Sequence, residues 1–163
     1  MNADDIRRLV AESVALKERF FEEAADTILD VARAVSLTLR DGGRVLAFGN
    51  GGSAADAQHL AAELVGRFRR ERPGLAALAL GADPSVVTAL GNDLGFESIF
   101  RRQVEAHGRP GDVALGFTTS GRSANVVEGL QAARSRGLVT VGLTGEGGGD
   151  LAGLVHHLLA VPH

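Results

Sequence analysis

The spacing of apolar residues divides the chain into a helical leader and a region of alternating strands and helices. From residue 3 to about residue 39, apolar side chains recur three or four positions apart, with charged residues between them. This spacing predicts an amphipathic helix, about 50 Å long if it is continuous. One small domain does not need so long a helix, so we expect part of its apolar face to pack against another subunit. The alternative is that the helix packs only on its own sheet.

Beyond residue 43, short apolar runs are separated by glycine or proline turns and by helical segments. The expected strands cover residues 45–48, 75–80, 113–117, 138–143 and about 155–161. The expected helices lie between them, and Asp83-Pro84 is a good helix start. Strands that alternate with helices form a mainly parallel sheet with right-handed crossovers. At 163 residues, the chain has the size of a single α/β domain.

A glycine-rich turn, Gly49-Asn50-Gly51-Gly52, joins the first strand to the next helix. We expect Ser53 to cap this helix, with Asp56 three positions later completing a variant capping box. Glycines let the backbone approach a ligand closely, and the free amides at a helix start suit an anion. The turn therefore indicates a site for a phosphorylated small molecule. The alternative is that it is only a tight turn.

His59 and Glu63 follow in the same helix, four residues apart. This spacing places both side chains on one face, where they can ligate a metal together or act as an acid/base pair. Taken alone, His59 is equally well explained as a half-buried surface residue. Its occurrence with Glu63 directly after a glycine-rich turn favours a functional site.

A second polar loop, Thr118-Thr119-Ser120-Gly121-Arg122-Ser123, follows the third expected strand and precedes a helix from about Ala124 to Arg136. Four hydroxyl groups next to helix-start amides form a second candidate anion site, although serine and threonine also occur there simply as caps. In a parallel sheet both loops lie at the carboxyl ends of strands, which is where such folds bind ligands.

Three further groups of polar residues are less informative. Residues 91–96 are expected to form a loop that presents Asn92 and Asp93, and capping of the next helix is the preferred role for Asp93. Of the basic residues at positions 67, 69, 70 and 72, only Arg67 is expected near the site, because it lies one turn beyond Glu63. The others fit a solvated helix end. The adjacent histidines at positions 156 and 157 face opposite sides of a strand and are expected to be structural.

Composition excludes several classes of protein. A net charge of −3, with seven phenylalanines as the only aromatic residues, argues against direct nucleic-acid binding. No apolar run approaches the length of about 20 residues that spans a bilayer. The charged amino terminus lacks a signal-peptide core and there are no cysteines, so we expect a cytoplasmic protein with no membrane partner.

Several segments together resemble the sugar isomerase (SIS) domain, and specifically the phosphoheptose isomerases. They are, in order, GNGGSAADAQHLAAEL, RPG, GNDLGF, GDVALGFTTSGRSANV and VGLTGEGGG. The resemblance extends from about residue 43 to the end, and the helical leader also has a counterpart in the family. It implies a three-layer αβα sandwich around a five-stranded parallel sheet, with residues 1–40 as a leader for oligomer packing and residues 41–163 as the phosphosugar-binding domain. It also implies a homotetramer with active sites at subunit boundaries.

The resemblance further implies conversion of sedoheptulose 7-phosphate to D-glycero-D-manno-heptose 7-phosphate. Glu63 matches the catalytic carboxylate, and His59 and Glu63 match ligands of one zinc ion per site. Thr118 stands where the family usually has serine. The positions that match substrate-binding residues are Asn50, Gly51, Gly52, Ser53, Arg67, Asn92, Asp93, Thr118, Thr119, Ser120 and Ser123.

These residue types suit the implied chemistry. Moving a carbonyl between two carbons needs a base, an acid and a means of stabilising an enediolate. A carboxylate can transfer the proton, zinc can polarise the oxygens, and phosphate contacts supply binding energy remote from the reacting carbons.

The sequence departs from the family at its end. Relatives continue into a further long helix whose glutamine and histidine complete the zinc site, whereas this sequence ends at His163, to which we assign no such role. Besides the isomerase, two hypotheses about function remain. The chain could form a non-catalytic tetramer that binds the replication initiator protein, or it could be a phosphosugar-sensing module. The presence of His59 and Glu63 favours the enzyme, because a scaffold has no need for that pair.

Overall fold

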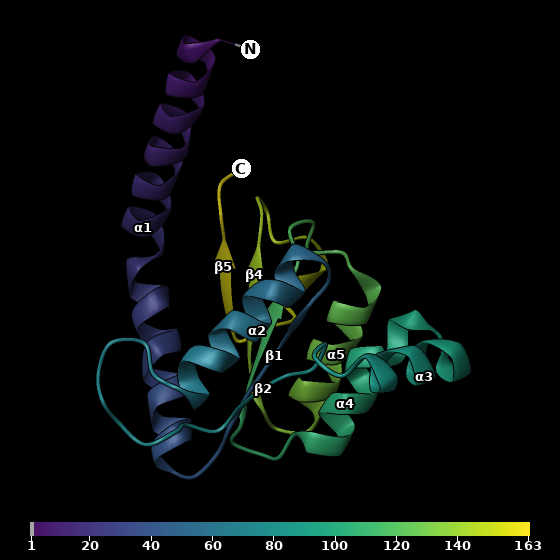
Figure 1. Ribbon diagram of the computed structural model, residues 1–163. Coiled ribbons are helices and arrows are strands. Elements are labelled where there is room, and N and C mark those ends of the chain that lie inside the picture. The colour runs from purple at the N-terminus through teal and green to yellow at the C-terminus, as the bar shows by residue number, and fades with distance from the viewer. Residues whose placement is uncertain (1) are drawn as a thin grey trace.

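The computed structural model describes residues 2–163 as a five-stranded parallel sheet with helices on both faces (Figure 1). The strand order is β2-β1-β3-β4-β5, and every neighbouring pair is parallel. The strands are β1 (Val45–Gly49), β2 (Ala77–Ala79), β3 (Val113–Phe117), β4 (Val139–Thr144) and β5 (His157–Ala160). The predicted α/β sandwich is therefore confirmed, although β2 and β5 are shorter than their apolar runs.

Two apolar clusters cover the two faces of the sheet. The helices are α1 (Ala3–Arg40), α2 (Gly52–Val65), α3 (Pro84–Leu94), α4 (Ile99–His107) and α5 (Ala124–Ser135), with 3-10 turns η1 (Phe96–Ser98) and η2 (Gly149–Leu151). Successive side chains of a strand point to opposite faces. Leu46 and Phe48 accordingly pack with α3, α4 and α5, whereas Val45 and Ala47 pack with α1 and α2. Helices α2 and α5 therefore cover opposite faces of the sheet.

Helix α1 is capped at its start and contacts strands β1, β3 and β5 of the sheet. The Asn2 side chain accepts hydrogen bonds from the amides of Asp4 and Asp5, a good N-cap arrangement. Near the other end, Val31 and Val35 join the apolar cluster that covers the sheet. The amino-terminal half extends beyond the sheet (Figure 1). Its exposed apolar residues include Ile6, Leu9, Val10 and Val14.

Helix α3 is longer than expected. The Asp83 carboxylate accepts hydrogen bonds from the amides of Ser85 and Val86, which confirms the predicted start. The expected loop over residues 91–96 is wrong, because the helix continues to Leu94 and ends at Gly95. Gly95 has a φ of 89°, which glycine adopts readily and other residues do not. Asn92 and Asp93 thus lie on the last turn of α3, and Asp93 does not cap the next helix.

Helix α2 ends earlier than expected, at Val65 rather than at Pro73-Gly74. The Arg72 guanidinium folds back and donates to the carbonyl oxygens of Glu63 at 2.7 Å and Leu64 at 2.8 Å. These carbonyls belong to the last turn of the helix, where no intrahelical amide reaches them. The basic cluster therefore lies in an irregular segment rather than on a solvated helix end, and Arg72 has a structural role.

His156 stands immediately before the edge strand β5 and contacts Thr140 in β4. Its ring Nδ1 accepts a hydrogen bond from the Thr140 amide at 3.0 Å and lies 2.8 Å from the Thr140 hydroxyl. Only an unprotonated Nδ1 can accept from an amide. Partial burial, followed by the nearby charges of Arg134 and His157, lowers the pKa of His156 below 6.5. This histidine is thus structural, as expected.

We expect acid to loosen the attachment of β5 through His156. Because the unfolded chain binds this proton more readily, the stabilisation is complete above about pH 6.5 and is lost as the pH falls through the lower pKa of the folded state. In His156→Asn, the amide oxygen supplies an acceptor that does not titrate. Thermal unfolding midpoints of the two proteins should run parallel above pH 7 and diverge below pH 6.5, with the wild type falling faster. Equal slopes throughout would refute this role for His156.

Candidate active site

The glycine-rich turn after β1 begins helix α2 two residues before the expected cap. Gly51 occupies the N-cap position with a φ of 55°, and Ser53 lies inside the first turn, where the helix has no side-chain capping bond. The predicted Ser53 cap and its box with Asp56 are therefore wrong. A serine at position 51 would be strained at this φ, whereas glycine is not, which explains why the helix begins there. The Ser53 hydroxyl and the first amides of the helix remain free for a ligand.

The loop after β3 is held together by its own hydroxyl groups. The Thr118 side chain is buried, and its Oγ1 lies 2.9 Å from Ser123 Oγ and 3.5 Å from Ser120 Oγ. Ser120 Oγ also accepts a hydrogen bond from the Arg122 amide. Ser123 occupies the N-cap position of α5 but makes no side-chain capping bond. The hydroxyls of residues 120 and 123 thus organise the loop around Thr118.

The two predicted loops meet in one cavity at the carboxyl ends of β1 and β3. Ser53, Thr118 and Thr119 line this space of about 410 Å³, which we name the hydroxyl cavity. Leu16 of α1 and Thr144 at the end of β4 also line it. The strand order places β1 beside β3, with their following helices on opposite faces. This is the switch point at which open parallel sheets bind ligands.

A reciprocal amide pair ties the two loops together across the sheet edge. Asn50 Nδ2 donates to Asn125 Oδ1 at 2.9 Å, and Asn125 Nδ2 donates to Asn50 Oδ1 at 2.8 Å. Asn125 is buried at the start of α5. The Asn50 amide is thus engaged within the protein, and its contact with a substrate stays a prediction.

Gly49 is required where β1 approaches β3 and the start of α2. A Cβ atom on Gly49 would lie 2.7 Å from the Cβ of Ser53 and 2.8 Å from the carbonyl oxygen of Phe117. Contacts this short force atoms apart. The absence of a side chain at position 49 therefore allows Ser53 and the Thr118 loop to share one cavity.

Gly49→Ala is expected to lower the free energy of unfolding by about 1–3 kcal/mol, the usual range for overpacking, and to weaken binding of inorganic phosphate. Urea denaturation and titration calorimetry measure the two effects. Gly52→Ala is the control for stability, because a Cβ there has nothing within 4 Å. Equal losses of stability in the two variants would show that crowding at position 49 is not the cause.

His59 and Glu63 line a second pocket of about 290 Å³, which we name the His59–Glu63 pocket. Its walls are completed by Asp56, Leu60, Phe68 and Phe117. His59 Nε2 lies 3.2 Å from Glu63 Oε1, so the predicted common face is confirmed. The Glu63 side chain is 34% exposed and the His59 side chain 75%, so both can reach a ligand. Asp56 and Phe117 line both spaces, which makes the two spaces neighbours.

The zinc prediction can be tested against the available donor groups. Within residues 2–163, no group of three or more histidine, cysteine, aspartate or glutamate side chains could hold a metal ion. Catalytic zinc usually has three protein ligands. His59 and Glu63 supply two donor atoms, and these two alone do not complete a zinc site.

Several predicted site residues line neither space. Asn50, Gly51, Gly52, Ser120 and Ser123 belong to the two loops beside the hydroxyl cavity without lining it, and Arg67, Asn92 and Asp93 come from other segments. Arg67 pairs with Glu71 at 3.0 Å, and both side chains are exposed. Asn92 Nδ2 donates to Asp93 Oδ1 at 2.7 Å on the last turn of α3. None of the three predicted ligands lines the hydroxyl cavity or the His59–Glu63 pocket. Their contacts with a substrate stay predictions.

Sequence reasoning missed the residues that connect the two spaces. Asp56 lies three positions after Ser53 and seven before Glu63, a helical spacing that indicates the same stripe. The spacing alone predicts that Asp56 lies on the same helix face as Ser53 and Glu63, whereas a capping role for Asp56 does not. Phe68 and Phe117 gave no such signal, because only the folded chain brings them to the pocket.

Comparison with known proteins agrees with this α/β fold. Residues 9–145 match the SIS domain, and the chain belongs to that family. The phosphoheptose isomerase of Aquifex aeolicus (strain VF5) is 54% identical over 159 residues, covering 98% of this chain and 83% of the relative. The phosphoheptose isomerase of Nitratidesulfovibrio vulgaris (strain DSM 19637 / Miyazaki F) is 52% identical, covering 97% of this chain and 78% of the relative.

Two solved structures that resemble this chain are also phosphoheptose isomerases. The phosphoheptose isomerase of Neisseria gonorrhoeae superimposes with a TM-score of 0.91 at 43% identity, covering 98% of this chain and 85% of that one. The phosphoheptose isomerase of Francisella tularensis gives a TM-score of 0.94 at 36% identity, covering 100% of this chain and 87% of that one. Within the SIS domain family, the chain therefore groups with the phosphoheptose isomerases and is a sugar-phosphate isomerase. The two non-enzymatic readings are not favoured.

Proposed function

We propose that this chain converts sedoheptulose 7-phosphate into D-glycero-D-manno-heptose 7-phosphate through an enediolate. The observation that carries the proposal is the adjacency of the two spaces, because a ligand whose phosphate occupies the hydroxyl cavity can extend past Asp56 to Glu63. The phosphate end then fixes the register of the reacting carbons.

The phosphate would be held by hydroxyl groups and helix-start amides. Ser53 and Thr119 face the hydroxyl cavity, and Thr118 lies between Ser120 and Ser123. The starts of α2 and α5 stand on either side of the strand ends, and helix N-termini stabilise anions through their free amides and dipoles. Gly51 and Gly52 leave the backbone of the first turn open to an approaching oxygen.

Glu63 is the proposed proton carrier. Its carboxylate removes a proton from C1, the electron pair forms a C1–C2 double bond, and negative charge develops on the oxygen of C2. Glu63 then returns its proton to C2, and the proton of the C1 hydroxyl passes to the oxyanion at C2, which leaves a carbonyl at C1 and a hydroxyl at C2 and completes the aldose. His59, 3.2 Å from Glu63 Oε1, can donate a ring N–H to the developing oxyanion.

Zinc, oligomerisation and location complete the proposal. His59 and Glu63 would contribute two zinc ligands. Bound zinc would polarise the two sugar oxygens. The exposed apolar residues of α1, on a helix whose amino-terminal part extends beyond the sheet (Figure 1), support residues 1–40 as a leader that packs in a homotetramer, since apolar surface is usually covered. Within residues 2–163, no helix has the length and apolar character to span a bilayer. We place the enzyme in the cytoplasm, where phosphorylated sugars are made.

The proposed function is tested by incubating the protein with sedoheptulose 7-phosphate and zinc and following the sugar resonances by NMR. We expect the aldose signal to appear with the phosphate retained. Unphosphorylated sedoheptulose, which cannot occupy the hydroxyl cavity in the same way, should be turned over far more slowly. A protein that binds the sugar phosphate and never forms the aldose would overturn the proposal for this chain.

A further inference from the structure

Asp56 is the one acidic side chain that lines both spaces of the site. It stands on the stripe of α2 that also carries Ser53 and Glu63. The rise from Ser53 to Glu63 is about 15 Å along the helix axis, and Asp56 lies about 4.5 Å from the Ser53 end. A ligand that spans this stripe must be long, and it must pass Asp56 between the hydroxyl cavity and Glu63.

Within residues 2–163, the Asp56 carboxylate has no role in hydrogen bonding, helix capping or a three-ligand metal group. It is exposed, and no hydrogen bond or ion pair to it occurs within residues 2–163. It does not cap α2, because that helix begins at Gly51. It does not join His59 and Glu63 in a three-ligand metal group, since the described part of the chain contains none.

A carboxylate such as that of Asp56 can bind only some groups of a sugar phosphate. An ionised carboxylate only accepts hydrogen bonds, and it repels a phosphate group. Its natural partners in an acyclic sugar phosphate are therefore hydroxyl groups, and two oxygens on one carboxylate can accept from two neighbouring hydroxyls. Short sugars have few hydroxyls between the phosphate and the reacting carbons, whereas long ones have several.

We propose that Asp56 binds the hydroxyl groups in the middle of the sugar chain and thereby makes the enzyme select long-chain ketose phosphates over short ones. This inference rests on the proposed function, because it assumes a phosphate in the hydroxyl cavity and reacting carbons beside Glu63. Asp56 is a substrate-binding and specificity residue and takes no part in proton transfer.

The test compares wild type with Asp56→Asn, which preserves shape but removes the charge, and with Asp56→Ala, which removes the whole carboxylate. A hydrogen bond to a charged group corresponds to about 10- to 100-fold in binding. We expect kcat/KM for sedoheptulose 7-phosphate to fall by that factor in both variants, mainly through KM. The preference for this seven-carbon ketose over a five-carbon ketose phosphate should shrink, while competitive inhibition by inorganic phosphate should not weaken, because the Asp56 carboxylate repels a phosphate group.

Asp26→Asn is the matched control, because Asp26 is an exposed carboxylate of α1 that lines neither space. An unchanged seven-to-five-carbon preference, an equal loss of phosphate inhibition, or a loss confined to kcat would each overturn the inference. Thermal unfolding midpoints within a degree or so of wild type verify folding. If the wild type shows no turnover, only the proposed function fails. Calorimetric binding of sedoheptulose 7-phosphate to wild type and Asp56→Asn then decides whether Asp56 holds the chain.

Discussion

Glu63→Gln is expected to lower kcat for sedoheptulose 7-phosphate by about 10³-fold, within the range of 10²–10⁴ typical of a lost general base. Glutamine keeps the shape of the side chain but cannot take a proton from carbon. The hydroxyl cavity, which binds the phosphate, does not include residue 63. The variant should therefore bind sedoheptulose 7-phosphate with nearly unchanged affinity, as measured by calorimetry beside the NMR assay of turnover.

Glu22→Gln is the control for this prediction, since Glu22 is an exposed residue of α1 that lines neither space. It should retain wild-type turnover. A Glu63→Gln variant that still turns over at more than a tenth of the wild-type rate would show that another group carries the proton. Weak binding of the sugar phosphate by the same variant would show that Glu63 is a binding residue instead.

Asn125→Leu is expected to lower the free energy of unfolding by about 1–3 kcal/mol and to weaken phosphate binding as well. Leucine has nearly the shape of asparagine but leaves the partly buried amide of Asn50 without either of its hydrogen bonds, and an unsatisfied polar group costs about that much. The glycine-rich turn after β1 then loses its tie to the start of α5. Urea denaturation measures the first effect and titration with inorganic phosphate the second.

A double-mutant cycle measures the coupling energy between Asn50 and Asn125 separately from the other contacts of the two residues. If Asn50 and Asn125 act through each other, the loss of stability in Asn50→Ala, Asn125→Leu together is smaller than the sum of the two single losses. Additive losses would mean that the reciprocal hydrogen bonds contribute little, and that the two loops are positioned by the sheet alone. In that case phosphate affinity should also survive in the single variants.

The central strands β1 and β3 could be predicted because they are buried on both faces. A parallel strand covered by helices on each side is a continuous apolar run, and the runs at residues 45–48 and 113–117 have that form. Helix ends were harder to predict. The ends of α2 and α3 depend on Arg72 folding back onto carbonyl oxygens and on Gly95 adopting a positive φ, and apolar spacing encodes neither event.

The site was predictable where it depends on local spacing. His59 and Glu63 share a helix face because they are four residues apart, and the two polar loops converge because they follow neighbouring parallel strands. The Asn50–Asn125 pair joins residues 75 positions apart, which only the folded chain brings into contact.

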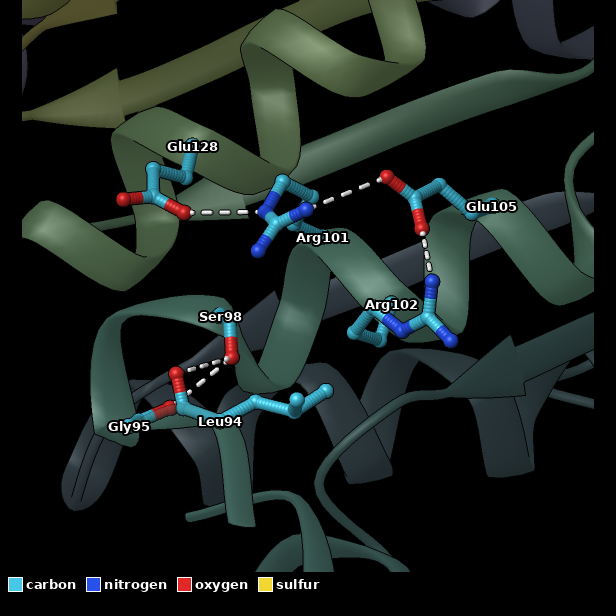
Figure 2. A network of polar contacts seen from close by, with 7 residues as sticks. All are labelled: Leu94, Gly95, Ser98, Arg101, Arg102, Glu105 and Glu128. Atoms are coloured by element: carbon cyan, nitrogen blue, oxygen red, sulfur yellow. Dashed lines mark hydrogen bonds and ion pairs between the residues drawn. The ribbon is translucent and has the colours of Figure 1, made fainter.

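The sequence pattern also did not predict polar contacts between different helices. Figure 2 shows Arg101 of α4 placed between Glu105 of the same helix and Glu128 of α5. The Arg101 contacts measure 3.4 Å to Glu105 and 3.1 Å to Glu128. The spacing of Arg101 and Glu105 indicates a pair on one helix, but the bond to Glu128 depends on how α4 packs against α5.

The central claim is that one phosphate occupies the hydroxyl cavity and delivers the reacting carbons to Glu63. A crystal structure of Glu63→Gln with sedoheptulose 7-phosphate tests it most directly. We predict phosphate oxygens within hydrogen-bond distance of the Ser53 and Thr119 hydroxyls, with C1 and C2 facing the side chain at position 63. A phosphate bound outside that cavity, or a sugar whose C1 and C2 point away from residue 63, would contradict the account.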